Sequence, residues 1–247
     1  MALREIIWGG ITAVAVVLGP APFWAAADTQ STAGVGALPP AAVMEQAAQR
    51  AMTPAQALQR LKEGNARFAS GKLVERDWIG AVKKTASGQY PFATILGCID
   101  SRVPPEIVFD QGIGDIFSVR IAGNFVDPEI LGSLEFASKV AGSKLIVILG
   151  HSACGAIKGA CDGVELGNLT TTLSHLRPAV EAVQDVPGPR NGKNAAFVDA
   201  VTHMNVRLTM ESLRKQSPIL DEMITKHEVG LVGGVYDVTT GVVTWLE

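Results

Sequence analysis

Three short apolar runs, each bounded by glycine or proline, constrain the fold more than any other feature of this sequence. Phe92 to Leu96, Ile116 to Ile121 and Leu145 to Leu149 have the length and the bounding residues of buried strands. Between the last two runs, Pro128 to Val140 repeats its apolar residues at helical spacing. Strand, helix and strand in this order predict a parallel sheet with crossover helices.

Further elements are expected on both sides of these runs. Thr53-Pro54-Ala55-Gln56 has the residues of a capping box with proline at the first helical position, so a helix is predicted to about Ala69. Ala195 to Lys215 predicts a long helix, and Val229 to Val238 with Val242 to Leu246 predicts two strands. The expected fold class is α/β: a mostly parallel central β-sheet flanked by helices, with an added C-terminal strand pair and N-terminal helix.

The first 27 residues differ in kind from the rest. Ile6 to Leu18 is almost purely apolar, about the length of a signal-peptide core and shorter than the roughly 20 residues that span a bilayer. Ala25-Ala26-Ala27 supplies small residues before Asp28. We therefore expect residues 1–27 to be a signal peptide cut after Ala27 and the protein to be periplasmic or secreted. The alternative is an uncleaved membrane anchor.

The remaining chain is expected to form one domain. Residues 28–52 are interpreted as a flexible tether, rich in Ala, Gly, Ser, Thr and Pro up to Pro40, followed by the start of an N-terminal helical region; residues 53–247 form the domain itself. No other stretch is apolar enough to span a membrane, so no membrane partner is expected after cleavage. A net charge of −3 without a long basic run argues against nucleic acid.

Two clusters of reactive side chains follow predicted strands. Cys98-Ile99-Asp100-Ser101-Arg102 comes after the first strand, and His151-Ser152-Ala153-Cys154 comes after the third. Because functional sites of open α/β sheets gather at the carboxyl ends of strands, Cys98, His151 and Cys154 can converge. His151 and Cys154 are three residues apart, so one turn of helix is expected to present both on the same side.

Two thiolates and one imidazole make a three-ligand zinc set, which leaves a fourth position for water as catalytic zinc sites do. Asp100 could ligate the metal or accept a hydrogen bond from its water, and Arg102 could hold that carboxylate away from the metal. Two alternatives remain at this point. The cysteines could be small core residues, or thiols in redox chemistry, although the sequence has no C-x-x-C motif.

The two segments resemble a known family. Gly97-Cys98-Ile99-Asp100-Ser101-Arg102-Val103-Pro104 and Gly150-His151-Ser152-Ala153-Cys154-Gly155 are similar to the two signature segments of the β-class carbonic anhydrases. The residues between them are similar as well, and the resemblance extends from about Pro54 to Glu247. It implies a zinc-dependent, reversible hydration of carbon dioxide to bicarbonate and a proton, by attack of zinc-bound hydroxide on CO2.

By this resemblance, Cys98, His151 and Cys154 are the Zn²⁺ ligands, and Asp100 with Arg102 forms the family's catalytic pair. In an inactive form known in part of the family, Asp100 itself takes the fourth metal position. The resemblance also assigns Gln89, Phe117 and Phe136 to the substrate pocket, with both phenylalanines supplied by a partner subunit. Self-association as a dimer or tetramer is therefore expected. Core packing of the phenylalanines and a loop position for Gln89 are the alternatives.

One departure from the family bears on regulation. Members regulated by bicarbonate carry a tryptophan three residues before the first zinc cysteine, where this chain has Ile95, although Arg120 and Tyr236 match the other two residues of that site. We therefore expect an open zinc site at neutral pH, with Asp100 paired to Arg102. Sulfur analogues such as carbonyl sulfide or carbon disulfide are alternative substrates, and a non-catalytic zinc or anion-binding protein is the alternative from another class. Cys161 matches no motif and is expected to be a small buried residue.

Overall fold

A computed structural model of the chain describes residue 39 and residues 41–246. The predicted signal peptide, its cleavage site after Ala27 and most of the predicted tether lie outside these residues. Within the described part, no helix is both long and apolar enough to pass through a bilayer.

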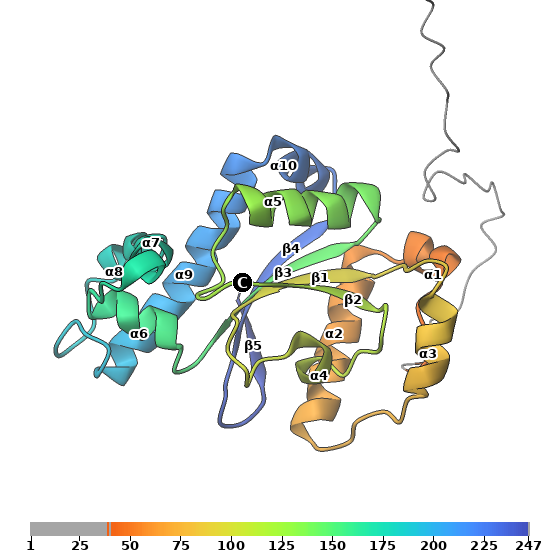
Figure 1. Cartoon of the computed structure of the whole chain (residues 1–247), viewed down its shortest axis with the longest axis horizontal. Helices are drawn as coiled ribbons and strands as arrows, with labels where there is room; N and C mark the ends of the chain where they lie inside the picture. The colour runs from red at the N-terminus through yellow and green to blue at the C-terminus, as the bar shows by residue number, and fades with distance from the viewer. Residues whose placement is uncertain (1–38, 40, 247) are drawn as a thin grey trace, which may run out of the picture. The chain divides into compact units, whose positions relative to one another are not determined.

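The described strands form one five-stranded sheet in the order β2-β1-β3-β4-β5 (Figure 1). Its members are β1 (Ala93–Gly97), β2 (Ile116–Arg120), β3 (Leu145–His151), β4 (Gly230–Tyr236) and β5 (Val243–Leu246). The first four strands are parallel, and β5 returns antiparallel to β4. The α/β class with a mostly parallel sheet is confirmed, and the C-terminal strand pair is part of that sheet.

The register brings the ends of the central strands to one edge. Gly97, the last residue of β1, pairs with Leu149 of β3, and His151 ends β3 two residues later. Every residue of β1 and β3 is buried, because helices cover both faces of the parallel sheet. Residues that follow β1 and β3 therefore emerge side by side.

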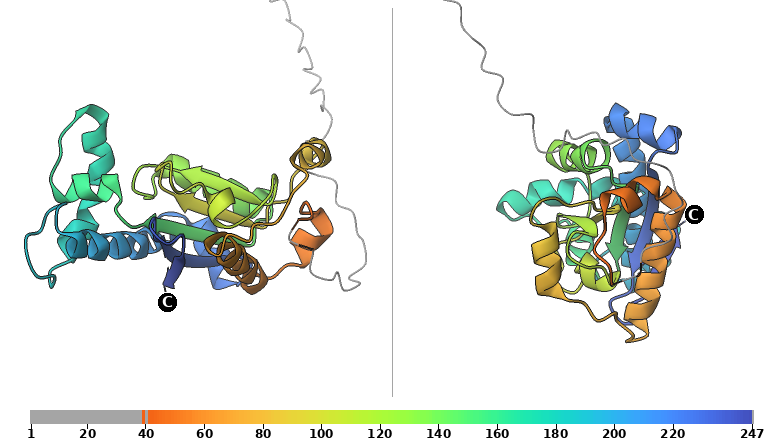
Figure 2. Two further views of the ribbon diagram at one scale, coloured as in Figure 1. Left: turned by 90° about the horizontal axis from the view of Figure 1, so that it is seen from below. Right: turned by 90° about the vertical axis from the view of Figure 1, so that its right-hand side faces the viewer.

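Helices form a layer on each face of the sheet (Figure 2). Leu61 belongs to a core with Ile95 and Val147 on one face, whereas Leu134 and Leu213 join Leu96, Ile146 and Ile148 on the other. The helices are α1 (Gln46–Ala51), α2 (Pro54–Ala69), α3 (Trp78–Thr85), α4 (Pro105–Val108), α5 (Pro128–Glu135), the π-helix η1 (Phe136–Val140), α6 (Gly155–Cys161), α7 (Gly167–Ser174), α8 (Arg177–Ala182), α9 (Ala195–Gln216) and α10 (Pro218–Thr225).

Helix α2 begins as the sequence predicts. The Thr53 hydroxyl accepts from the Gln56 backbone N–H, and the Gln56 side chain accepts from the Thr53 N–H, which confirms the capping box. One turn before the end, buried Asn65 donates to the carbonyls of Val108 and Gly241 and accepts from the Val243 N–H. This amide joins α2 to α4 and to β5, so it fixes the C-terminal end of the loop between β1 and α4.

The predicted helix from Pro128 to Val140 is confirmed in its extent, but its last turn is π-helical. The α-helix ends at Glu135, and a π-helical turn follows, closed by the Ala141 N–H donating to the Phe136 carbonyl. Gln49 donates its side-chain amide to the Ala141 carbonyl, which anchors the end of this widened turn. Apolar spacing reports a helix but does not reveal one wide turn inside it. Helix α1 lies in the region where an N-terminal helical segment was expected to start, whereas local patterns did not predict α3, α4, α6, α7, α8 and α10.

Candidate metal centre

Three buried side chains from separate elements converge at the carboxyl edge of the sheet. Cys98 directly follows β1, His151 ends β3, and Cys154 immediately precedes α6. Their candidate ligand atoms all lie within 4.8 Å of one another. Tetrahedral zinc with sulfur and nitrogen ligands needs separations of about 3.6–3.8 Å, so a small contraction would complete the set. The arrangement thus has the size and the donor types of a zinc site.

His151 and Cys154 meet through a turn, not through the helical turn that the sequence analysis expected. Ala153 has a φ of 56°, in the left-handed region, and α6 begins only after Cys154. Ser152 holds the turn in place, because its N–H donates to the Tyr236 carbonyl and its hydroxyl accepts from the Val238 N–H. This role of Ser152 could not be predicted from local patterns, because it depends on a segment more than 80 residues away.

The His151 ring is oriented for metal ligation. Its Nδ1 lies 3.0 Å from the Ser152 carbonyl, which can only accept, so Nδ1 carries the proton. Nε2 is therefore left with its lone pair. It is fully buried and has no hydrogen-bond partner among the described residues. A buried polar atom without a partner is costly, and a cation bound by Nε2 and the two sulfur atoms would remove that cost.

The two sulfur atoms differ in their electrostatics. A hydrogen bond from the Cys154 side chain lowers the pKa of Cys98, the Gly123 N–H adds to this effect, and burial opposes it. The same contact with Cys98, together with burial, raises the pKa of Cys154. The two pKa shifts have opposite directions because the sulfur atoms contact each other, and a divalent cation bound to both would favour their thiolate forms.

Asp100 lies beside this group but is held by Arg102. Arg102 Nε donates to Asp100 Oδ1 at 2.9 Å, and Nη2 donates to Oδ2 at 2.7 Å, a bidentate pair. The Arg102 backbone N–H also donates to Oδ1. These bonds hold the pKa of Asp100 well below its usual range, chiefly through the Arg102 side chain. Asp100 Oδ2 lies 3.9 Å from His151 Nε2, near enough to contact a fourth, non-protein ligand of a metal held by this group.

Arg120 fixes the loop that carries Cys98 and Asp100. From the end of β2, its Nε donates to the Cys98 carbonyl at 2.9 Å and its Nη2 to the Asp100 carbonyl at 2.6 Å. From the sequence, Arg120 was expected only as a residue of a bicarbonate site. Ile95 is fully buried in the core, and Tyr236 is 5% exposed. In this structure Arg120 thus holds the backbone of the loop that contains Cys98 and Asp100.

The three residues expected in the substrate pocket lie near the surface. Gln89 is exposed in the segment before β1. The rings of Phe117 and Phe136 pack edge to face, with centroids 6.4 Å apart, and Phe136 is 50% exposed. Such exposure argues against the core-packing alternative for Phe136.

The remaining cysteine and a histidine lie outside the group. Cys161, the last residue of α6, is half-buried, and burial raises its pKa. The ring of His175 stacks on Phe125 at a centroid distance of 4.2 Å. Neither side chain is among the three that converge at the sheet edge.

Comparison with known proteins places this geometry in a family. The family model described as carbonic anhydrase matches residues 93–243. Carbonic anhydrase 2 of Mycobacterium tuberculosis is 38% identical over 191 residues, which cover 76% of this chain and 90% of the relative. A carbonic anhydrase of Pseudomonas aeruginosa is 32% identical, covering 67% and 77%.

Solved structures agree with the sequence comparison. A β-carbonic anhydrase of Sordaria macrospora, described as tetrameric, superposes with a TM-score of 0.58 at 28% identity, covering 66% of this chain and 84% of the other. A Coccomyxa β-carbonic anhydrase in complex with acetazolamide superposes with a TM-score of 0.60 at 27% identity, covering 66% and 75%. The matched segment contains both signature motifs and all three converging side chains, and this chain therefore belongs to the β-class carbonic anhydrases.

Proposed function

We propose that this carbonic anhydrase binds one Zn²⁺ through Cys98, His151 and Cys154 and uses it to interconvert carbon dioxide and bicarbonate. The observation that carries the proposal is the buried convergence of two sulfur atoms and an unpartnered imidazole nitrogen at the sheet edge. Three protein ligands leave one position for water, as in catalytic zinc sites. When bound, zinc supplies a Lewis acid that makes a nucleophile from water near neutral pH.

The protein's own residues would orient that chemistry. Asp100, which Arg102 holds ionised, would accept a hydrogen bond from the attacking oxygen. This bond would direct the lone pair of that oxygen toward the substrate. Because Arg102 donates to both oxygens of the carboxylate, it would compete with a metal for Asp100. Retention of this pair favours catalysis over a purely structural metal site, which has no use for it.

A second copy of the chain would complete the substrate pocket. Strand β2 lies at the edge of the sheet, and Ile107, Phe136 and Val140 expose about half of their surface. The tetrameric Sordaria relative supports self-association. We propose that Phe117 and Phe136 of the partner subunit face Gln89 of the first subunit. The dimer-sized species should then be lost in the Phe136→Ser, Val140→Ser double variant on analytical ultracentrifugation; an unchanged assembly would place the interface elsewhere.

The zinc assignment is tested by metal analysis of purified variants. The wild-type protein should contain about one zinc per chain, whereas Cys98→Ser and Cys154→Ser should lose both zinc and activity because each removes a thiolate ligand. Cys161→Ser is the matched control, since this half-buried cysteine lies outside the group. Full zinc content in either ligand variant would overturn the assignment.

The site of action follows from residues 1–27, which lie outside the described structure. We propose that the leader is removed after Ala27 and that the enzyme works in the periplasm or outside the cell. N-terminal sequencing of protein from the native cell should begin at Asp28. An intact Met1 on soluble cytoplasmic protein would contradict this proposal.

A further inference from the structure

A chain of hydrogen bonds leads from the long helix α9 to one of the metal ligands. Asn205 Nδ2 donates to the Gly123 carbonyl at 2.9 Å, and the Gly123 N–H donates to Cys98 Sγ at 3.4 Å. Asn205 is 3% exposed, and the two bonds join residues 82 and 25 positions apart in the sequence. A buried amide that reaches over so long a sequence distance serves the loop that it contacts, because helix α9 does not need it for its own backbone bonds.

Gly123 cannot hold its own position. Its φ is +86°, and a Cβ at this residue would lie 2.7 Å from Leu176 Cδ1, so only glycine fits. Glycine also samples more backbone conformations than any other residue, which leaves the direction of its N–H free to vary. The hydrogen bond from Asn205 to the Gly123 carbonyl restricts this backbone freedom and so fixes the direction of the Gly123 N–H.

We propose that Asn205 is a positioning residue of the metal centre: it holds Gly123 so that its N–H donates to the Cys98 sulfur. The inference rests on the proposed zinc site. A hydrogen bond to a thiolate withdraws charge that the sulfur would otherwise donate to the metal, so it makes the metal a stronger Lewis acid. The bond matters in a site with two thiolates, whose combined charge opposes the acidity that carbon dioxide hydration needs.

The surroundings of Asn205 decide which variant tests this role. Asn205 lines a pocket of about 260 Å³ together with Phe125, His175 and Thr209. Alanine at position 205 would let water from this pocket replace the lost donor. Asn205→Leu keeps the volume and removes the donor without admitting water. Thr202→Val is the matched control, because Thr202 is equally buried on α9 and its hydroxyl donates only within the helix, to the Val198 carbonyl.

The experiment uses full-length protein loaded with Co²⁺, whose sulfur-to-cobalt charge-transfer band reports the electron density on the thiolates. In Asn205→Leu the band should shift to lower energy, and the pH midpoint of zinc-enzyme activity should rise, with kcat/KM at neutral pH falling roughly 10-fold. Asn205→Gln, which keeps an amide donor, should recover part of the shift. Thr202→Val should match the wild type in all three measurements.

A band and pH midpoint equal to those of the wild type in metal-loaded Asn205→Leu would overturn the inference. If that variant does not fold, the test uses the wild-type protein loaded with ¹¹³Cd. NMR should then show scalar coupling between the metal and the Gly123 amide proton through Cys98 Sγ. Absence of this coupling would also overturn the inference. A wild-type protein that binds no metal would instead refute the proposed zinc site, so the two failures are distinguishable.

Discussion

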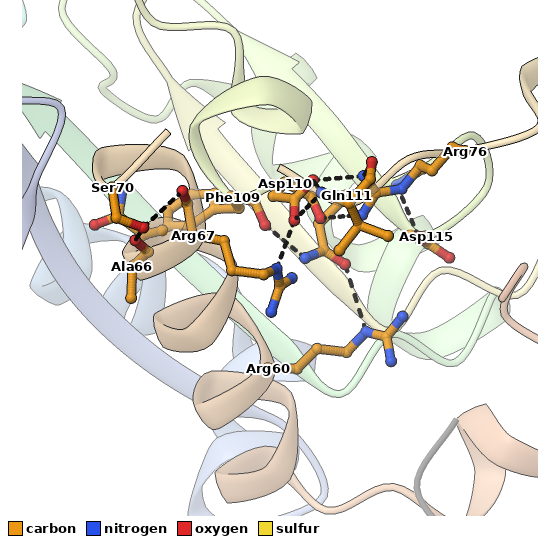
Figure 3. A network of polar contacts seen from close by, with 12 residues as sticks. Arg60, Ala66, Arg67, Ser70, Arg76, Phe109, Asp110, Gln111 and Asp115 are labelled. Carbon is orange, nitrogen blue, oxygen red and sulfur yellow. Dashed lines mark hydrogen bonds and ion pairs between the residues drawn. The ribbon is translucent and has the colours of Figure 1, made fainter. Parts of the chain in front are cut away.

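Two aspartate–arginine contacts flank helix α4, and they have opposite character. Asp100, before the helix, is paired with Arg102 at the candidate metal centre, where the two side chains are 17% and 51% exposed. Asp110, after the helix, is 1% exposed and receives Arg67 Nε at 2.6 Å and Arg76 Nη1 at 2.5 Å (Figure 3). The two aspartates thus lie ten positions apart in the sequence but pair with arginine in different environments.

The surroundings of Asp110 are those of a structural clamp. Its carboxylate also lies within 3.3–3.4 Å of the Val74 N–H, and Arg76 donates to the Asp110 backbone carbonyl as well. Asp110 has a φ of 47°, a conformation that the surrounding bonds hold in place. The clamp joins α2, the segment before α3 and the end of α4, so it stabilises the segments next to the loop that contains Asp100.

The comparison shows that burial, not residue identity, decides what such a contact does. A buried carboxylate with two guanidinium partners has no other stable arrangement, since breaking it would leave a charge unpaired away from water. The exposed pair at the metal centre can exchange its partner for water or metal at small cost. Only the second contact is therefore suited to chemistry.

The largest expected effect comes from breaking the clamp. Asp110→Asn removes the charge but keeps a side chain that tolerates positive φ, and it should lower the free energy of unfolding by about 3–5 kcal/mol because it removes the buried carboxylate charge that both Arg67 and Arg76 contact. Urea unfolding measures this. Arg67→Met is the graded control, because Arg67 is 22% exposed and should cost less. Equal, small losses in both variants would show that the clamp is not a buried unit.

The second effect comes from breaking the exposed pair. Arg102→Ala frees the Asp100 carboxylate to bind the metal in place of water, so kcat should fall by roughly 10- to 100-fold with zinc retained. The free energy of unfolding should change by no more than about 1 kcal/mol. Stopped-flow hydration assays, metal analysis and urea unfolding give the three values. Ser101→Ala, an exposed neighbour, serves as the control; a stability loss as large as that of Asp110→Asn would erase the contrast.

The smallest effect concerns acid. Arg102 lowers the folded-state pKa of Asp100, so the stability that the pair contributes is fully present above the unfolded-state pKa of about 3.9 and is lost only as the pH falls through the lower folded-state value. The difference in unfolding free energy between wild type and Asp100→Asn should therefore stay constant from about pH 7 to pH 4. The difference should then shrink between about pH 4 and pH 2. No change over that range would mean that Arg102 does not lower the pKa of Asp100 in solution.

Much of this architecture could be predicted from local patterns. The glycine-bounded apolar runs correspond to β1, β2 and β3, and the capping box at Thr53 begins α2 as expected. The two signature segments follow neighbouring strands, so Cys98, His151 and Cys154 could be placed together in advance. The wide turn of η1 and the turn through Ala153 could not, because both depend on contacts with distant segments.

The sequence alone specifies the order of the strands along the chain, the residues at their carboxyl ends and hence the donor types of the candidate metal centre. Those features depend on periodicity and on bounding residues, which act over a few positions. Three other features depend on the folded structure: which aspartate is buried, which His151 nitrogen is available to a metal, and which amide reaches Cys98. Each of these is a hydrogen bond whose direction is set by how elements pack, and packing brings together residues that no local pattern connects.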